Sequence, residues 1–163
     1  MIPEIKRILY ATDLSENARH ALGYAASISN RYGASLVILH TMEDLPADAK
    51  SIVEQIIGEE KWEELKKTNK EKSAEAIKTR ILNVCDELAS EEPECPFIPE
   101  EIIVKIGHPV EEILKLAERP AIDLIVMGSH GRGIFADAVM GSTSRRVLRR
   151  CKKPVLIVRL PKA

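Results

Sequence analysis

The order of apolar and polar positions predicts a chain in which short strands alternate with helices. Apolar runs predict five strands, over residues 5–12, 35–41, 101–106, 123–127 and 154–159. The second, fourth and fifth runs are almost continuously apolar, which is typical of parallel strands covered on both faces. Strands that alternate with helices in this way predict an open α/β sheet.

Four helices are expected between the strands. The first begins at Ser15 and ends at Tyr32-Gly33, and the third opens at Pro109. A long second helix is predicted over residues 52–89, which are rich in Glu and Lys, and the fourth runs from Ser142 to Cys151. Residues 43–51 are expected to form a flexible loop over one edge of the sheet.

Composition narrows the class of protein. The chain has 163 residues, 45% of them hydrophobic, which fits a single domain over residues 1–163. It has 24 Lys and Arg against 25 Asp and Glu, a balance that does not favour nucleic acid or an anionic membrane as a partner. Three isolated cysteines, no apolar leader and no span of about 20 apolar residues predict a cytoplasmic protein.

Two predicted strand ends carry unusual polar or glycine content. The first strand runs into Ala11-Thr-Asp-Leu-Ser15, and the fourth into Gly128-Ser-His-Gly-Arg-Gly133. Ligands of open α/β sheets bind beyond the carboxyl ends of the strands, so the two loops share one crevice if these strands are neighbours. Gly-rich backbone and the helix that begins near Ser142 both offer N–H groups to an anion. The pattern suits a polyphosphate, although the glycines can also serve a tight turn and Ser142-Thr-Ser144 can cap a helix.

Two common phosphate motifs are absent from the chain. There is no G-x-x-x-x-G-K-[ST] sequence, which excludes a P-loop nucleoside triphosphatase. The turn after the first strand has no glycine, which excludes the dinucleotide fingerprint in its usual place.

The glycine spacing G-x2-G-x9-G-[ST] is met by Gly128, Gly131 and Gly141-Ser142. With its flanking segments, this spacing resembles the ATP-binding branch of the universal stress protein family, over nearly the whole chain. The resemblance implies a Rossmann-like, adenine nucleotide alpha hydrolase-like fold, with a five-stranded parallel sheet of order 3-2-1-4-5 and helices on both faces.

The resemblance also implies a set of nucleotide-binding residues. Asp13 would lie near the adenosine, Ala11 and Thr41 would meet the adenine and ribose through backbone groups, and Met127 would lie beside the ribose. Mg²⁺ or Mn²⁺ would arrive with the phosphates of ATP rather than through protein ligands. The phosphates would be held by the glycine loop and the following helix: Gly128, Ser129, His130, Gly131, Arg132, Gly133, Gly141, Ser142, Thr143 and Ser144.

Several of these residues have alternative interpretations. Asp13 can cap the helix near Ser15, and His40, on an apolar strand, is expected to be a core or rim histidine. His130 has no recognisable nucleophile or second carboxylate nearby, so we expect no enzymatic activity. The basic run 145–153 has no interleaved aromatic residue, and a helix C-terminus favours cations, so no nucleic-acid contact is expected.

Three functional hypotheses follow. The first is an ATP-binding regulator of a stress response whose protein partner is unknown. The second is a slow ATP hydrolase or phosphotransferase that uses His130 or Asp13. The third is an interaction module that works without nucleotide. The last strand is expected at a sheet edge, and the resemblance implies a homodimer formed there.

Overall fold

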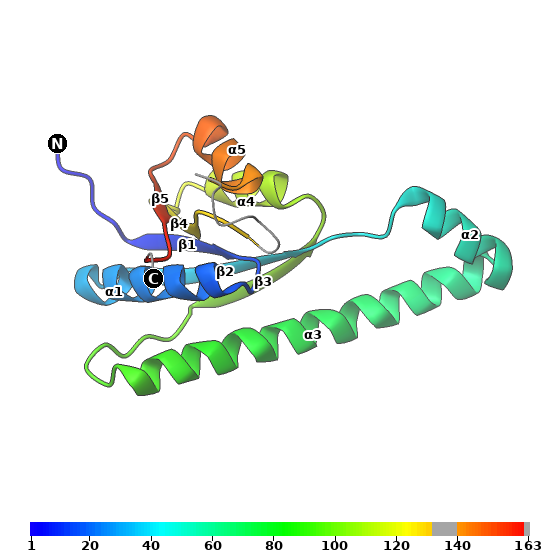
Figure 1. The fold of residues 1–163 in the computed structure, drawn as a ribbon, viewed down its shortest axis with the longest axis horizontal. Helices are drawn as coiled ribbons and strands as arrows, with labels where there is room; N and C mark the ends of the chain where they lie inside the picture. The colour runs from blue at the N-terminus through cyan, green and yellow to red at the C-terminus, as the bar shows by residue number, and fades with distance from the viewer. Residues whose placement is uncertain (132–139, 162–163) are drawn as a thin grey trace.

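The computed structural model describes residues 1–131 and 140–161. Strands and helices alternate along the chain (Figure 1). The strands are β1 (Arg7–Thr12), β2 (Ser35–Met42), β3 (Glu101–Ile106), β4 (Leu124–Gly128) and β5 (Val155–Val158). The helices are α1 (Glu16–Tyr32), α2 (Ala47–Ile57), α3 (Glu59–Glu91), α4 (Pro109–Ala117) and α5 (Ser142–Arg150).

All strand pairs in the sheet are parallel, and the strand order is β3-β2-β1-β4-β5. The predicted order is therefore confirmed. Residue Ala11 of β1 lies opposite Leu39 of β2 on one side and Met127 of β4 on the other. Because β1 and β4 are neighbours, the loops that follow them leave the same edge of the sheet. The short strand β5 forms the end of the sheet beside β4, as the sequence predicted.

Side chains of each strand alternate between the two faces, and each face has its own helical cover. One core contains Ile8, Tyr10, Ile38 and Val126 together with residues of α1 and α3. The other contains residues of the opposite parity, such as Leu9 and Ile125, with α4 and α5. Figure 1 shows the resulting three layers, with α1 and part of α3 below the sheet and α4 and α5 above it.

Local signals set the ends of three helices as predicted. The side chain of Ser15 accepts a hydrogen bond from the backbone N–H of Ala18 and caps α1, and Gly33 ends this helix at φ 64°. Pro109 is the first residue of α4, where its fixed φ suits the helix and its missing N–H costs nothing. The helix α5 begins at Ser142, directly after its cap residue Gly141.

The prediction for residues 43–89 was wrong in two respects. Residues 47–51 are helical, and the helix predicted over 52–89 is two helices, α2 and α3. Gly58 separates them with a φ of 88°, a conformation that side-chain-bearing residues rarely adopt. Apolar and charged residues continue at helical spacing on both sides of Gly58, so the pattern alone gives no sign of the break.

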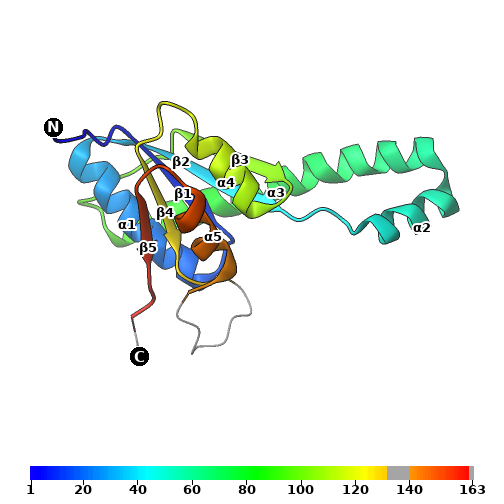
Figure 2. The ribbon, with the colours of Figure 1, turned by 90° about the horizontal axis from the view of Figure 1, so that it is seen from above.

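These two helices form an arm that leaves the rest of the molecule. The chain exits β2, runs outward to α2, and returns through α3, whose C-terminal half packs below the sheet (Figures 1 and 2). Residues Ile81 and Cys85 are the buried residues of α3, and none of residues 43–80 is buried. No helix within the described residues has the length and apolar character needed to cross a membrane.

Candidate functional site

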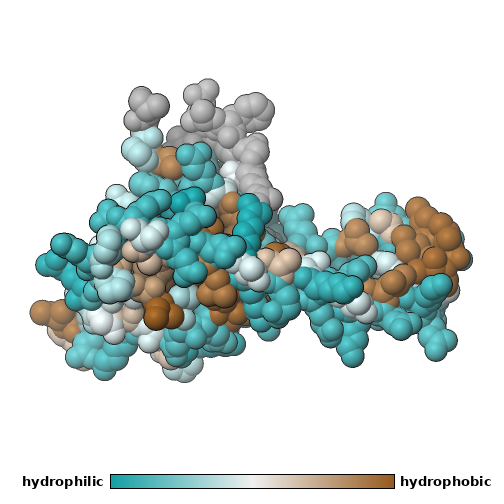
Figure 3. All heavy atoms as spheres, turned by 90° about the horizontal axis from the view of Figure 1, so that it is seen from below, coloured by the Kyte–Doolittle hydropathy of each residue, from teal (hydrophilic) through white to brown (hydrophobic). Residues whose placement is uncertain are grey.

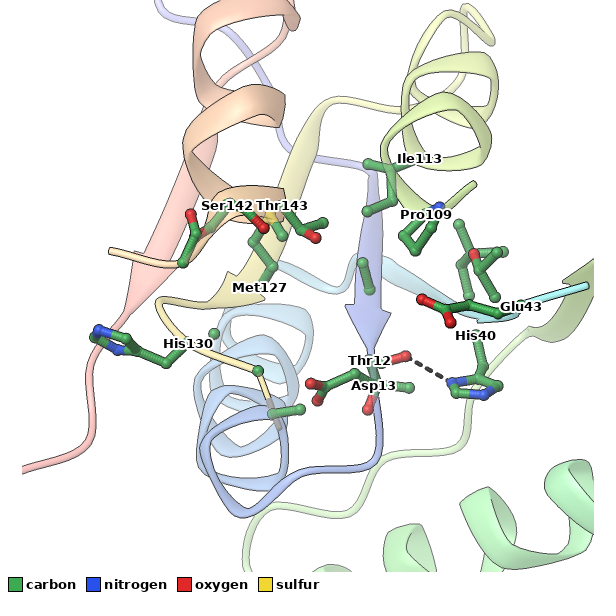
Figure 4. A pocket seen from close by; sticks show the side chains of 18 of the residues that line it. Thr12, Asp13, His40, Glu43, Pro109, Ile113, Met127, His130, Ser142 and Thr143 are labelled. Carbon is green, nitrogen blue, oxygen red and sulfur yellow. Dashed lines mark hydrogen bonds between the residues drawn. The ribbon is translucent and has the colours of Figure 1, made fainter. Parts of the chain in front are cut away.

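A cavity of about 500 Å³ opens at the carboxyl ends of β1, β2 and β4. Its walls come from these three strand ends, from the glycine loop after β4, and from the first turns of α4 and α5 (Figure 4). It is therefore the crevice that the sequence predicted between the first and fourth strands.

The turn from β1 to α1 forms one wall of the cavity. Leu14 has a φ of 64°, a left-handed conformation that costs a residue of this type about 1 kcal/mol. Two side chains hold the turn: Thr12 Oγ1 accepts a hydrogen bond from Leu14 N, and Asp13 Oδ1 accepts one from Ser15 N, each at 3.0 Å. The Asp13 carboxylate thus supports the start of α1 but does not cap it, because Ser15 is the cap residue.

The glycines at the end of β4 and in the loop that follows it are required by close packing. A Cβ on Gly131 would lie 2.5 Å from Asp13 Oδ2, and a Cβ on Gly128 would lie 2.9 Å from Asn17 Oδ1. Neither glycine has a positive φ, although the sequence suggested that such a conformation was one use for them. Their role is to let the loop lie directly against the start of α1.

Asn17 joins this loop to two other elements. Its side chain is 4% exposed, and its Oδ1 accepts a hydrogen bond from His130 N at 2.7 Å. Its Nδ2 donates to the carbonyl oxygen of Val158 in β5 at 3.2 Å, and Ser129 N donates to the same oxygen at 2.8 Å. The amide of Asn17 therefore fixes the glycine loop relative to α1 and β5. Sequence reasoning missed this residue because nothing in its local pattern distinguishes it from an ordinary polar helix residue.

The first turn of α5 forms the wall opposite Asp13. Ser142 and Thr143 face the cavity near Met127 (Figure 4). The hydroxyl of Ser144 is 2.9 Å from the carbonyl oxygen of Ser129 and 3.1 Å from that of Gly141, so its single proton bonds within the protein. The first N–H groups of any helix have no acceptor inside the helix, and the positive end of the helix dipole lies there. This wall is suited to an anion.

Two predicted residues of the glycine loop, Ser129 and His130, differ in where their side chains lie. Ser129 is fully buried and does not line the cavity; its Oγ lies 2.7 Å from His130 Nδ1. His130 lines the cavity, but Figure 4 shows its ring directed away from Asp13. A role for Ser129 in ligand binding therefore has to come from its effect on the loop.

The end of β2 supplies residues that the sequence analysis did not select. His40 Nδ1 lies 2.8 Å from the carbonyl oxygen of Thr12, which agrees with the expected role as a rim histidine. The side chain of Glu43 points into the cavity in Figure 4, opposite the α5 wall. The sequence analysis assigned Glu43 to a flexible loop and did not consider it as a site residue. Only the parallel register of β2 beside β1 brings Glu43 to the cavity.

The structure brings most of the predicted residues to one cavity. Those that line it are Ala11, Asp13, Thr41, Met127, Gly128, His130, Gly131, Gly141, Ser142, Thr143 and Ser144. Predicted residues Arg132 and Gly133 lie outside the described residues. The lining residues that were not predicted are Thr12, Ala18, Leu39, His40, Met42, Glu43, Pro109 and Ile113.

The two sides of the cavity differ in chemistry. Apolar side chains of Leu39, Pro109 and Ile113 lie toward β2 and α4, whereas glycine backbone, hydroxyls and helix N–H groups lie toward β4 and α5. Among residues 1–131 and 140–161, no group of three or more His, Cys, Asp or Glu side chains could hold a metal ion. A flat apolar group and a linked anion would find complementary surfaces at opposite ends.

Comparisons with known proteins agree with this architecture. The sequence model of the universal stress protein family matches residues 4–159. Universal stress protein MJ0577 of Methanocaldococcus jannaschii is 32% identical over 158 residues, which cover 94% of each chain. A universal stress protein of Thermus aquaticus is 32% identical over 155 residues, covering 94% of this chain and 98% of that one.

Solved structures give the same result at the level of the fold. The structure of hypothetical protein MJ0577 has a TM-score of 0.72 and 30% identity, and covers 99% of this chain and 100% of that chain. UspA of Lactobacillus plantarum has a TM-score of 0.68 at 24% identity, and covers 97% of this chain and 100% of that chain. Together with the match over residues 4–159, these similarities show that the chain belongs to the universal stress protein family.

Proposed function

We propose that this protein binds ATP and acts as a nucleotide-dependent regulator, without a catalytic role of its own. The observation that carries the proposal is the convergence of the glycine loop, the α5 N-terminus and three strand ends on a single cavity of about 500 Å³. Its volume lies within the range of small-molecule and cofactor sites.

The two sides of the cavity orient the nucleotide. The adenine and ribose lie toward Ala11, Thr41 and Met127, with the apolar side chains of Leu39 and Ile113 nearby. The phosphates lie toward Gly128–Gly131 and the first turn of α5, because anions are stabilised by helix N–H groups. The Glu43 carboxylate favours the same orientation, since it would repel phosphates and can accept hydrogen bonds from ribose hydroxyls.

Known members of the fold support an adenine nucleotide. One solved universal stress protein, at a TM-score of 0.56 and 22% identity, is a complex with cAMP. Another, from Archaeoglobus fulgidus, is a complex with dAMP at a TM-score of 0.56 and 18% identity. A divalent cation, Mg²⁺ or Mn²⁺, would reach this site through the phosphates, because the described residues offer no cluster of ligands for it.

The case against catalysis comes from what surrounds the candidate groups. Asp13 Oδ1 is engaged with Ser15 N, and the ring of His130 is bonded to buried Ser129 and points away from Asp13. A hydrolase would need one of them to orient an attacking water beside the phosphates. We therefore propose a protein that binds ATP and whose partner, or whose pairing through the open edge of β5, depends on the nucleotide.

The direct test is to extract the purified protein with acid and to look for ATP by chromatography. Calorimetric titration of nucleotide-free protein should then show tighter binding of ATP than of AMP, because the phosphate wall adds contacts. Absence of nucleotide in the extract together with no heat of binding would refute the proposal. Turnover of labelled ATP that is lost in His130→Ala, with binding kept, would instead establish the enzymatic alternative.

A further inference from the structure

A second cavity lies below the sheet, between α1 and α3. It has a volume of about 270 Å³, against about 500 Å³ for the proposed nucleotide cavity. Voids larger than one water molecule are few in a well-packed domain, and a water occupies about 30 Å³, so this cavity has room for about nine. It is therefore large enough for an organic molecule of about nine non-hydrogen atoms.

The walls of this second cavity are largely apolar. Two of them belong to the core below the sheet, in which Leu22 is 2% and Ile81 3% exposed. Tyr10 also lines the cavity, but its hydroxyl donates its proton to the carbonyl oxygen of Ala18. Figure 3 looks onto the side of α1 and α3 and shows apolar atoms lying between charged ones there. Such walls would cover an aliphatic group. The apolar lining residues, with Tyr10, are Leu14, Leu22, Ile81 and Val84.

Three charged side chains also line the cavity, and two of them have no ion pair. Arg19 contacts Glu87 at 3.1 Å and Glu91 at 3.4 Å, so its charge is already balanced. Among the residues that the structure describes, Glu16 and Arg80 form no salt bridge with each other or with any other residue. The cavity thus presents one anion and one cation that lack a partner, beside an apolar wall.

One wall of this cavity is the turn that also bounds the proposed nucleotide cavity. Thr12 lines both cavities, Asp13 lines the first and Leu14 lines the second. Leu14 adopts a φ of 64°, where glycine would cost less, and the leucine keeps an apolar side chain on the wall. Backbone conformations of this kind are frequent at ligand sites. A ligand in the second cavity would therefore contact the turn that carries Asp13.

We propose that the second cavity binds a free α-amino acid with an aliphatic side chain, such as leucine. The carboxylate of the amino acid pairs with Arg80, whose planar guanidinium matches a carboxylate, and its ammonium group pairs with Glu16. Its side chain lies against Leu14, Ile81 and Val84. Leucine, with about nine non-hydrogen atoms, matches the volume of the cavity.

Ligands that carry only some of these features fit less well. An apolar carboxylate would bring a second negative charge beside Glu16, and an apolar amine would bring a positive charge beside Arg80. A neutral apolar molecule would remove water from both charges without replacing it. A zwitterion with an apolar side chain complements the anion, the cation and the apolar wall together.

Binding here should be coupled to the first cavity, a step that rests on the proposed function. A ligand that holds Leu14 in its left-handed conformation also holds Asp13, whose carboxylate lies against Gly131 of the glycine loop. Leucine should therefore raise the affinity for ATP, and by linkage ATP should raise the affinity for leucine by the same factor. Binding of leucine without binding of ATP would support the second site and remove the nucleotide proposal.

The test is calorimetric titration of the purified natural chain with leucine at up to about 10 mM, a range suited to a ligand of this size. Two analogues each lack one charge: isocaproate has no ammonium group, and isoamylamine has no carboxylate. We expect each analogue to bind at least about tenfold more weakly than leucine, because each loses one charge-assisted pair.

Two variants assign the charges to the two residues. Arg80→Gln should weaken the binding of leucine about tenfold or more and should not weaken the binding of isoamylamine, which has no carboxylate to lose. Glu16→Gln should weaken the binding of leucine in the same way and should not weaken that of isocaproate. The matched controls Glu118→Gln and Arg119→Gln change exposed charges outside both cavities and should leave leucine binding unchanged. Circular dichroism verifies that each variant keeps its helices.

Three results would overturn the proposal. The first is no heat of leucine binding at up to about 10 mM. The second is an affinity for isocaproate or isoamylamine that equals or exceeds the affinity for leucine, which would assign the cavity to a ligand with a single charge. The third is a loss of leucine binding in Arg119→Gln as large as the loss in Arg80→Gln.

Discussion

The sheet and the arm are built from similar residues and differ in what covers them. Isoleucine occupies both, but Ile38 in β2 is fully buried and Ile56 in α2 is 76% exposed. In the sheet, most apolar strand residues pack against helices on one face or the other, and this packing fixes their positions. In the arm, α2 and the first half of α3 contact each other, but none of residues 43–80 is buried. The ligand cavity belongs to the first region.

The largest expected effect tests this difference in burial directly. We expect Ile38→Ala to lower the free energy of unfolding by about 2–5 kcal/mol, because it removes buried methylenes and leaves a cavity. The matched change Ile56→Ala should alter it by less than about 0.5 kcal/mol, because this side chain is exposed. Urea denaturation of both variants measures the two values. Similar losses in both would show that the arm is part of the cooperative core.

Two asparagines, one buried and one exposed, give a second pair of matched substitutions. We expect Asn17→Ala to cost about 1–3 kcal/mol, because it removes the partner of His130 N in a buried setting. It should also weaken the binding of ATP more than the binding of adenosine, since the glycine loop contacts the phosphates in our proposal. Asn69→Ala, on the exposed face of α3, is the control and should change neither quantity. Equal losses for ATP and adenosine would contradict the role of Asn17 in holding the loop.

Substitutions at two glycines distinguish the two reasons for which a glycine can be required, close packing and backbone conformation. In Gly131→Ala, the new Cβ would lie 2.5 Å from Asp13 Oδ2, so the carboxylate must turn away from the loop. We expect ATP affinity to fall about tenfold, or about 1.4 kcal/mol, with a smaller change in stability. Gly58→Ala meets no atom within 4 Å but requires a φ of 88°, so it should disturb the α2–α3 junction and leave ATP affinity unchanged. Calorimetry and helical circular dichroism separate the two results.

The sequence predicted those parts of the molecule whose signals are local or periodic. The near-continuous apolar runs located β2, β4 and β5, and Ser15, Gly33 and Pro109 marked helix ends. The strand order came from the family resemblance rather than from the pattern. Gly58 was missed because the helical period of charged and apolar residues runs through it, and only its φ of 88° reveals the break.

The candidate site divides in the same way. Glycine spacing identified Gly128 and Gly131, but the reason for the glycines, close contact with Asn17 and Asp13, needs the packed loop. Asn17 and Glu43 join the site only through elements that are distant in sequence. Ser144 was expected to offer its hydroxyl to phosphate, and the fold instead directs that hydroxyl to carbonyl oxygens of the protein. Residues that act through tertiary contacts produce no periodic pattern in the sequence.

The smallest expected effect compares two exposed ion pairs, one in each region. Arg150 bonds to Glu111 at 2.6 Å and ties α5 to α4, and this hydrogen bond holds the pKa of Glu111 below its ordinary value. Lys50 bonds to Asp44 at 2.6 Å beside the arm and lowers the pKa of Asp44 in the same way. A carboxyl group with a lowered pKa in the folded state stabilises the fold above its ordinary pKa, and loses that contribution as the pH falls through the lowered value.

Glu111→Gln should therefore be slightly less stable than the natural chain near neutral pH and equal to it in acid, since the pair is exposed and screened. Asp44→Asn should show no difference at either pH, because the uncovered arm can open locally before the sheet unfolds. The measurement is the urea midpoint of the three proteins across the acid range, and a pH-dependent difference for Asp44→Asn would mean that the arm and the sheet unfold as one unit.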